Sequence, residues 1–102
     1  SGIYKIYLKS IKYIETRDRR TVIHTEDGDI ISQKQLKDHE LRLPGKVFVR
    51  CHTSYIVNLG YFHSLAGNDI RLITGEILPV SRNRKATVTQ CVMEYLEGGQ
   101  KP

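Results

Sequence analysis

Apolar and polar residues alternate along the first quarter of the chain in the manner of half-buried β-strands. Residues 3–15 mix β-branched and aromatic side chains with polar ones, which predicts one or two strands with Ile11 and Tyr13 on the inner face. A polar, turn-like stretch follows at 16–20, and residues 21–25 then have the pattern of a returning strand. The chain is therefore expected to begin as an antiparallel hairpin with an arginine-rich tip.

Turn-forming and helix-capping residues define the next elements. Gly28 can take the positive φ that an Asp-Gly hairpin turn requires, and a further strand is expected directly after it. Ser32 is a candidate cap for a short helix near 33–40, which the pair Pro44-Gly45 would bring to an end. A strand over 47–52 is predicted to follow this helix.

The strand over 47–52 has two different faces. Alternation places Val49 and Cys51 on one face and Arg50 and His52 on the other. The next stretch, 54–65, is too apolar for a loop and too irregular for one element.

The last third of the chain predicts a hairpin and then a helix. Residues 69–73 and 76–80 flank Thr74-Gly75 as the two strands of the hairpin. Ser81 is a candidate cap for a helix near 82–97, which Gly98-Gly99 would end. The apolar positions of this helix recur at spacings of three and four residues: Val88, Cys91, Val92, Tyr95 and Leu96.

Together these elements predict a mainly β (α+β) fold. It consists of several short antiparallel strands in small sheets, with one short helix near 33–40 and a carboxyl-terminal helix near 82–97. The 102 residues suffice for one domain over 1–102, and 39% of them are hydrophobic, enough to form a core. No apolar run approaches the roughly twenty residues needed to cross a bilayer.

The chain is basic, which narrows its partners without choosing among them. Sixteen Lys and Arg against eleven Asp and Glu give a net charge of +5, and the sequence pI is about 9.4. Such a charge favours a polyanionic partner, and nucleic acid, an anionic membrane and an acidic protein all remain open.

Cysteine and histidine spacing indicates neither a metal site nor an enzyme. Cys51 and Cys91 form no CxxC pair, and the four histidines form no HxxxH or HExxH motif, so no metal and no cofactor are expected. Neighbours on a strand point to opposite faces, so Cys51 and His52 cannot pair as nucleophile and base. This cysteine usage fits a reduced cytoplasmic compartment.

Two clusters of positive charge are candidates for binding an anion. They comprise Arg17, Arg19 and Arg20 at the predicted hairpin tip, and Arg82, Arg84 and Lys85 at the start of the last helix. Guanidinium groups can fork onto phosphates or onto the acceptor edge of guanine. The alternative for both clusters is ordinary solvation. At the helix start, however, the dipole disfavours cations, and a phosphate bound there would compensate for this conflict.

Residues 48–58 read FVRCHTSYIVN and resemble the signature of the LytTR family, the DNA-binding domains of LytR- and AgrA-like response regulators. The resemblance spans about residues 5–97. Residues 11–15 are similar to the family's early strand, and residues 78–82 to the stretch that enters its last helix. It implies a mostly β fold whose loops enter successive major grooves of promoter DNA.

The resemblance also implies roles for particular residues. The base-reading positions of such domains correspond here to Arg20, Thr53 and Arg82. Residues expected on the DNA backbone are Arg17, Arg19, Arg50, His52, Ser54, Arg84 and Lys85. Simple alternation would send Thr53 to the face of Cys51, so the strand has to end near His52 for this assignment to hold.

The resemblance further implies partners outside this chain. The expected protein is a cytoplasmic bacterial transcription regulator, the output domain of a two-component phosphorelay, with an N-terminal receiver or other signalling domain. The full-length protein would form a dimer on double-stranded promoter DNA containing direct repeats, and this domain would make no membrane contact. The alternative is a basic module that docks protein or RNA without reading a DNA sequence.

Overall fold

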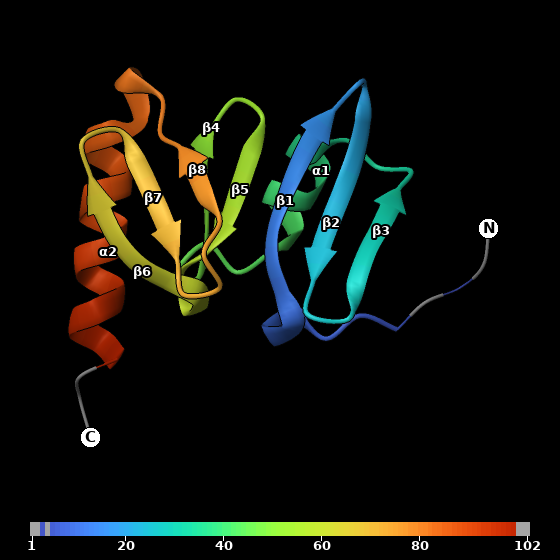
Figure 1. The fold of residues 1–102 in the computed structure, drawn as a ribbon, viewed down its shortest axis with the longest axis horizontal. Coiled ribbons are helices and arrows are strands. Elements are labelled where there is room, and N and C mark those ends of the chain that lie inside the picture. The colour runs from blue at the N-terminus through green and yellow to red at the C-terminus, as the bar shows by residue number, and fades with distance from the viewer. Residues whose placement is uncertain (1–2, 4, 100–102) are drawn as a thin grey trace.

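The computed structural model describes residue 3 and residues 5–99 and arranges them as two antiparallel sheets with two helices (Figure 1). The strands are β1 (Ile11–Arg17), β2 (Arg20–Thr25), β3 (Gly28–Ser32), β4 (Phe48–His52), β5 (Tyr55–Asn58), β6 (Phe62–Ala66), β7 (Asp69–Leu72) and β8 (Ile77–Pro79). The helices are α1 (Leu36–Arg42) and α2 (Lys85–Gly99), with the 3-10 turns η1 (Leu8–Ser10), η2 (Leu59–Tyr61) and η3 (Arg82–Arg84). The predicted mainly β fold with a carboxyl-terminal helix is confirmed.

The two sheets differ in size and in how their strands are ordered. The larger sheet has the order β3-β2-β1-β5-β4, and the smaller one has the order β6-β7-β8. In the larger sheet β5 pairs with β1, with Tyr13 opposite Val57 and Glu15 opposite Tyr55. This pairing brings the turn between β4 and β5 beside the tip of the β1–β2 hairpin, which is distant in sequence.

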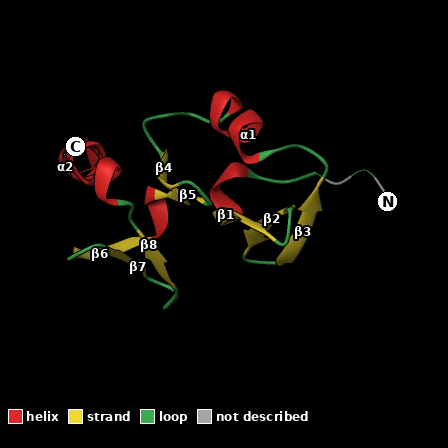
Figure 2. Ribbon diagram, turned by 90° about the horizontal axis from the view of Figure 1, so that it is seen from above, coloured by secondary structure: helices red, strands yellow, loops and turns green. Residues whose placement is uncertain are grey.

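Two hydrophobic clusters meet at β4 and β5. One contains Ile14 and Ile56 and is covered by α1, whose Leu36 inserts into it. The other, which includes Val57 and Val88, lies among the opposite face of β4 and β5, the smaller sheet and α2. Figure 2 shows α1 on one side of the larger sheet and α2 beside the smaller one. Because β4 and β5 are buried on both faces, the turn that joins them is held on a rigid base.

The short helix α1 starts later than Ser32 predicts. The Ser32 hydroxyl lies 2.7 Å from Nε2 of His39 and accepts the backbone N–H of Lys34, so it is engaged outside a cap. Gln35 takes the cap position instead, and its backbone N–H donates to the carboxylate of Asp38 at 3.1 Å. The helix is therefore shifted from 33–40 to 36–42.

The last helix begins as the 3-10 turn η3 and continues as α2 through Gly99. Ser81 precedes η3, but its hydroxyl makes no capping bond. Of the predicted apolar stripe, Val88 and Val92 are buried, whereas Leu96 is 42% exposed. The predicted end at 97 is wrong by two residues.

Three other boundaries differ from the predictions. The first strand starts at Ile11, because η1 occupies the residues before it and Ser10 bonds back to the carbonyl of Tyr7 through both its N–H and its hydroxyl. Part of the predicted 3–15 strand, residue 4, lies outside the described residues. The irregular stretch 54–65 contains β5, η2 and most of β6. The last hairpin is shorter than predicted, since its strands are β7 and β8.

Candidate nucleic-acid interface

Three turns lie together at one end of the molecule, the upper end in Figure 1. They are the β1–β2 turn, the β4–β5 turn and η3, and we call this region the loop end. Backbone hydrogen bonds tie the three turns together. The N–H of Thr16 donates to the carbonyl of Ser54 at 2.9 Å, and the N–H of Ser81 donates to the carbonyl of Cys51 at 2.9 Å.

The tip of the β1–β2 hairpin is a two-residue turn. Asp18 and Arg19 have φ values of 51° and 65°, and Arg17 pairs with Arg20 across the strands. Positive φ at both central residues is the geometry of a type I′ turn, whose twist matches that of paired strands. The side chains of Arg17, Arg19 and Arg20 are exposed there, so the tip presents a compact group of guanidinium groups.

The β4–β5 turn resolves the question that alternation raises for Thr53. The register between β4 and β5 shifts between Arg50 and His52, and β4 ends at His52. Thr53 therefore lies in the turn and not in the strand, so strand alternation does not place it on the face of Cys51. Its side chain is exposed. The next backbone N–H, that of Ser54, donates to Nδ1 of His52 at 3.0 Å and helps to fix the turn.

Arg50 lies behind this turn and is bound internally. Its Nε donates to the carbonyl of His52 at 3.0 Å, and a terminal nitrogen donates to the carbonyl of Thr53 at 2.5 Å. The other terminal nitrogen forms an ion pair with Glu40 of α1 at 2.8 Å. Only 14% of the Arg50 side chain is exposed. Its guanidinium is therefore arranged to position the turn that carries Thr53.

The entry to the last helix supplies the third group of cations. Arg82 is exposed at the start of η3, whereas Arg84 and Lys85 are half-buried. The Lys85 amine donates to the carbonyl of Gly67 in the β6–β7 turn. Arg82 thus has the most accessible guanidinium of this segment.

A buried polar cluster lies behind the hairpin tip, and the sequence analysis did not identify it. His24 contacts the Glu15 carboxylate through Nε2 at 2.5 Å and the Asp29 carboxylate through Nδ1 at 2.8 Å. Its ring stacks on Tyr13, whose pKa is raised to about 12 by burial and by the negative charge of Glu15. Glu15 also pairs with Arg17 at 2.9 Å. The sequence did contain a signal for this cluster, because Glu15 and His24 are polar residues within the strand patterns of β1 and β2.

The loop end therefore has bound cations and free ones. Among the residues that the structure describes, no hydrogen bond or ion pair involves the side chains of Arg19, Arg20, Arg82 or Arg84. Uncompensated guanidinium groups at neighbouring turns create a positive potential that attracts phosphate.

Neither cysteine nor metal chemistry has support at this end. Cys51 is completely buried, and burial raises the pKa of its thiol to about 12, so the thiol stays protonated at neutral pH. Within residues 3 and 5–99 no group of three or more potential ligands is arranged to hold a metal ion. In the same part of the chain, no helix has the length and apolar character needed to span a bilayer.

A small β scaffold that presents three turns at one end, two of them carrying exposed arginines, defines a class of DNA-binding domain. The chain belongs to the LytTR family, because the LytTr DNA-binding domain model matches residues 1–93. This is a family of DNA-binding domains and not of enzymes. The structure is also similar to the LytTr DNA-binding domain of a protein described as a methyl-accepting/DNA response regulator from Bacillus cereus. The TM-score is 0.79 at 24% identity, over 85% of this chain and 84% of that one.

Two curated relatives come from Paraburkholderia xenovorans. The heme-containing CO-sensing transcriptional regulator RcoM 2 is 34% identical over 88% of this chain and 36% of its own length. The regulator RcoM 1 of the same description is 34% identical over 81% of this chain and 33% of its own length. The chain therefore spans about a third of the length of these relatives and is homologous to transcriptional regulators.

Proposed function

We propose that this domain binds double-stranded promoter DNA in a sequence-specific manner and reads it through the three turns of the loop end. The observation that carries the proposal is the gathering of Arg20, Thr53 and Arg82 on exposed turns that share one end of the scaffold. Base edges in a major groove are accessible to side chains on such protruding turns.

The three positions have different reading capacities. Arg20 and Arg82 can each bind the O6 and N7 acceptors of guanine with two hydrogen bonds, which gives about 1–3 kcal/mol of discrimination against another base. Thr53 has one hydroxyl and one methyl group, so it is the weaker reader. We expect most of the base preference to come from the two arginines.

Other residues of the loop end hold the phosphates in this proposal. They are Arg17, Arg19, His52, Ser54, Arg84 and Lys85. Arg50 acts on the same interface from behind, because its guanidinium is bound to the carbonyls of the β4–β5 turn. Phosphate contacts add affinity and salt dependence, while base contacts add selectivity.

The size of the domain is compatible with two grooves. Its longest dimension is 39 Å, and one turn of B-DNA spans about 34–36 Å. In Figure 1 the three turns follow one another along part of this dimension, and in this proposal they face successive major grooves on one side of a duplex. A dimer would then bind two direct repeats.

The domain is proposed to act in the cytoplasm of a bacterium as the output part of a longer regulator. A receiver domain of a two-component system is one source of the signal. The relatives described as heme-containing and CO-sensing favour a second arrangement, in which a ligand-sensing domain controls the DNA-binding domain.

Selection from a randomised duplex pool tests this function. We expect several rounds of selection with the 102-residue chain to enrich two short direct repeats about one helical turn apart. The variant Arg82→Ala should bind the enriched site with a flattened base preference at the positions that Arg82 reads. Lys46→Gln is the matched control, because Lys46 lies in the α1–β4 loop away from the loop end.

Two results would contradict the proposal. One is the absence of enrichment together with uniform, steeply salt-dependent binding to every duplex, which a basic docking module would give. The other is an Arg82→Ala variant that binds the selected site with unchanged affinity and selectivity.

A further inference from the structure

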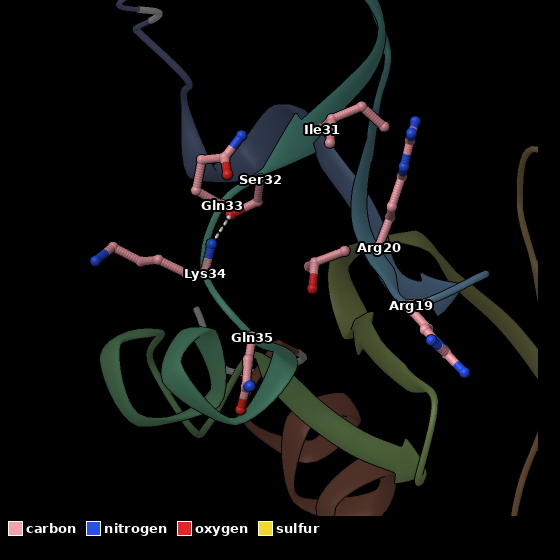
Figure 3. Close-up of a pocket in the computed structure, with 8 residues that line it drawn as sticks. Arg19, Arg20, Ile31, Ser32, Gln33, Lys34 and Gln35 are labelled. Carbon is pink, nitrogen blue, oxygen red and sulfur yellow. Dashed lines mark hydrogen bonds between the residues drawn. The ribbon is translucent and has the colours of Figure 1, made fainter.

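A basic recess lies beside the hairpin tip, next to the residues already assigned to base reading. It has a volume of about 520 Å³ and is bordered on one side by Arg19, Arg20 and Thr21 of the hairpin. The opposite border is the segment from Ile31 to Gln35, which connects β3 to α1. Figure 3 shows Arg19 and Arg20 on one side of this space and Gln33, Lys34 and Gln35 on the other.

The recess continues towards the β4–β5 turn. A second hollow of about 440 Å³ shares Arg19, Thr21 and Gln35 with the first and reaches Lys37 of α1 and Thr53. The surface between the hairpin and α1 therefore forms one concave path from the position of Arg20 to that of Thr53.

Positive charge lines both sides of this path. Arg19 and Arg20 lie on the hairpin, Lys34 lies on the facing segment and Lys37 lies on α1, and all four side chains are exposed. No ion pair found among the described residues includes any of them. The Asp38 carboxylate of α1 accepts the backbone N–H of Gln35. A concave surface with such walls concentrates positive potential.

The other lining groups suit a sugar and phosphate chain. Gln33 and Gln35 carry exposed amides that can donate to phosphate oxygens, and Ile31 is 51% exposed and offers an apolar contact to a deoxyribose. The backbone at the entrance is held in place, since the N–H of Lys34 donates to the Ser32 hydroxyl at 3.1 Å.

We propose that this recess binds the sugar–phosphate backbone of the duplex beside the base read by Arg20, with Lys34 and Lys37 as additional phosphate contacts. The inference rests on the proposed function and extends it to a segment outside the three reading turns. In Figure 3 the Lys34 side chain extends outward from the rim of the recess. Its flexible stem lets the amine turn towards a phosphate at little energetic cost, because the side chain is exposed.

Salt-dependent binding separates these contacts from base reading. Affinity for the duplex selected by the unmodified chain is measured by fluorescence anisotropy across salt for Lys34→Gln, Lys37→Gln and the double variant. The slope of log K against log salt is negative, and each lost phosphate contact should reduce its magnitude by about 0.9 and weaken binding about fivefold at 0.15 M salt. The base preference of these variants should remain unchanged. Lys34→Arg, which keeps the positive charge, should bind the duplex as tightly as the unmodified chain does.

Lys46→Gln serves as the matched control, since it also removes one exposed lysine but lies in a different recess, with Glu94 and Gly98 of α2. If Lys34→Gln and Lys37→Gln keep the slope of the unmodified chain, or behave like Lys46→Gln, the inference is wrong while the sequence-specific function stands. If the unmodified chain selects no site, the slopes are measured on an arbitrary duplex; an equal reduction by all three variants there would mean that the recess makes no specific contact and that the proposed function fails as well. Melting temperatures of all variants establish that each one is folded.

Discussion

At the scale of single residues, the cations of the loop end have two roles. Some hold the turns in place through internal hydrogen bonds, and others are exposed and free to bind a partner. Arg50 is held by internal acceptors, whereas Arg20 and Arg82 are exposed and carry no internal partner within residues 3 and 5–99. A fixed backbone with free guanidinium groups is the arrangement that allows two hydrogen bonds to one guanine. Charge alone would not distinguish these two groups of arginines.

Arg50 provides a test of positioning against charge. The variant Arg50→Lys keeps the positive charge but cannot donate to two carbonyls and Glu40 in the same geometry. We expect it to bind the selected duplex more weakly, by about 1–3 kcal/mol, with relaxed preference at the position read by Thr53. The measurement is a titration of single-base variants of the site. Unchanged binding by Arg50→Lys, together with loss in Arg50→Gln, would instead assign Arg50 to a phosphate.

Thr53 offers a gain-of-selectivity test. Asn can bind the N6 and N7 groups of adenine with two hydrogen bonds, whereas Thr has one hydroxyl. Thr53→Asn should therefore raise the preference for adenine at one position of the site by about 1–3 kcal/mol, and Thr53→Ala should not. Selection profiles of both variants measure the effect. A profile of Thr53→Asn identical to that of the unmodified chain would remove Thr53 from the reading surface.

At the scale of elements, the β1–β2 turn holds two charged residues, Asp18 and Arg19, in a backbone conformation that such residues rarely adopt. Asp18 and Arg19 occupy the left-handed region with φ values of 51° and 65°, where Asn and Gly are the usual residues of a type I′ turn. The position of the turn could be inferred from the polar run between two strand patterns. Its type could not, because neither residue is glycine or asparagine.

Replacing both residues of this turn separates stability from binding. The double variant Asp18→Asn, Arg19→Gly should raise the free energy of unfolding by about 1 kcal/mol, since Gly has no steric penalty at positive φ. DNA affinity should fall because the Arg19 cation is lost. Asp18→Asn alone, which keeps Arg19, is the control. Chemical unfolding and anisotropy titrations give the two quantities, and a double variant that is less stable would contradict the turn assignment.

The short helix shows which part of an element the sequence could supply. Its existence follows from a capping residue after a strand, but the sequence analysis offered only Ser32 as the cap, and the structure uses Gln35. The choice of Gln35 depends on His39, which engages the Ser32 hydroxyl, and on Asp38, which accepts the Gln35 N–H. Lys34 was consequently assigned to a helix, and its position at the rim of a recess was not foreseen.

At the scale of the whole molecule, alternation predicted the strands but not how they meet. The motif at 48–58 and the two arginine clusters were identified from the sequence. Their meeting depends on β5 pairing with β1 and on the register shift beside His52, which are long-range features. The two sheets are further connected by an ion pair between Lys12 of β1 and Glu76, 2.7 Å apart. No local pattern places these two residues together.

This ion pair should make stability depend on acid pH. Burial alone would raise the pKa of Glu76, but hydrogen bonds from Lys12 and Thr74 outweigh it and lower the pKa from 4.5 to about 2. The folded state therefore gains stability from Glu76 above pH 4.5, and this gain is lost as the pH falls towards 2.

Melting temperatures between pH 2 and 7 test the ion pair against two variants. Glu76→Gln should lower the melting temperature at pH 7 and reduce its fall below pH 4.5. Glu97→Gln, a change at an exposed position of α2, should retain the acid dependence of the unmodified chain. Parallel curves for Glu76→Gln and the unmodified chain would contradict the role of the pair.

Mapping the contact surface in solution tests the central claim most directly. Backbone amide chemical shifts of the labelled chain are followed during titration with the selected duplex and with a scrambled duplex of equal length and composition. We predict that the largest changes specific to the selected duplex lie at the β1–β2 turn, the β4–β5 turn and η3. Changes concentrated on the carboxyl-terminal half of α2 and the β7–β8 turn, or identical changes with both duplexes, would contradict DNA reading by the loop end.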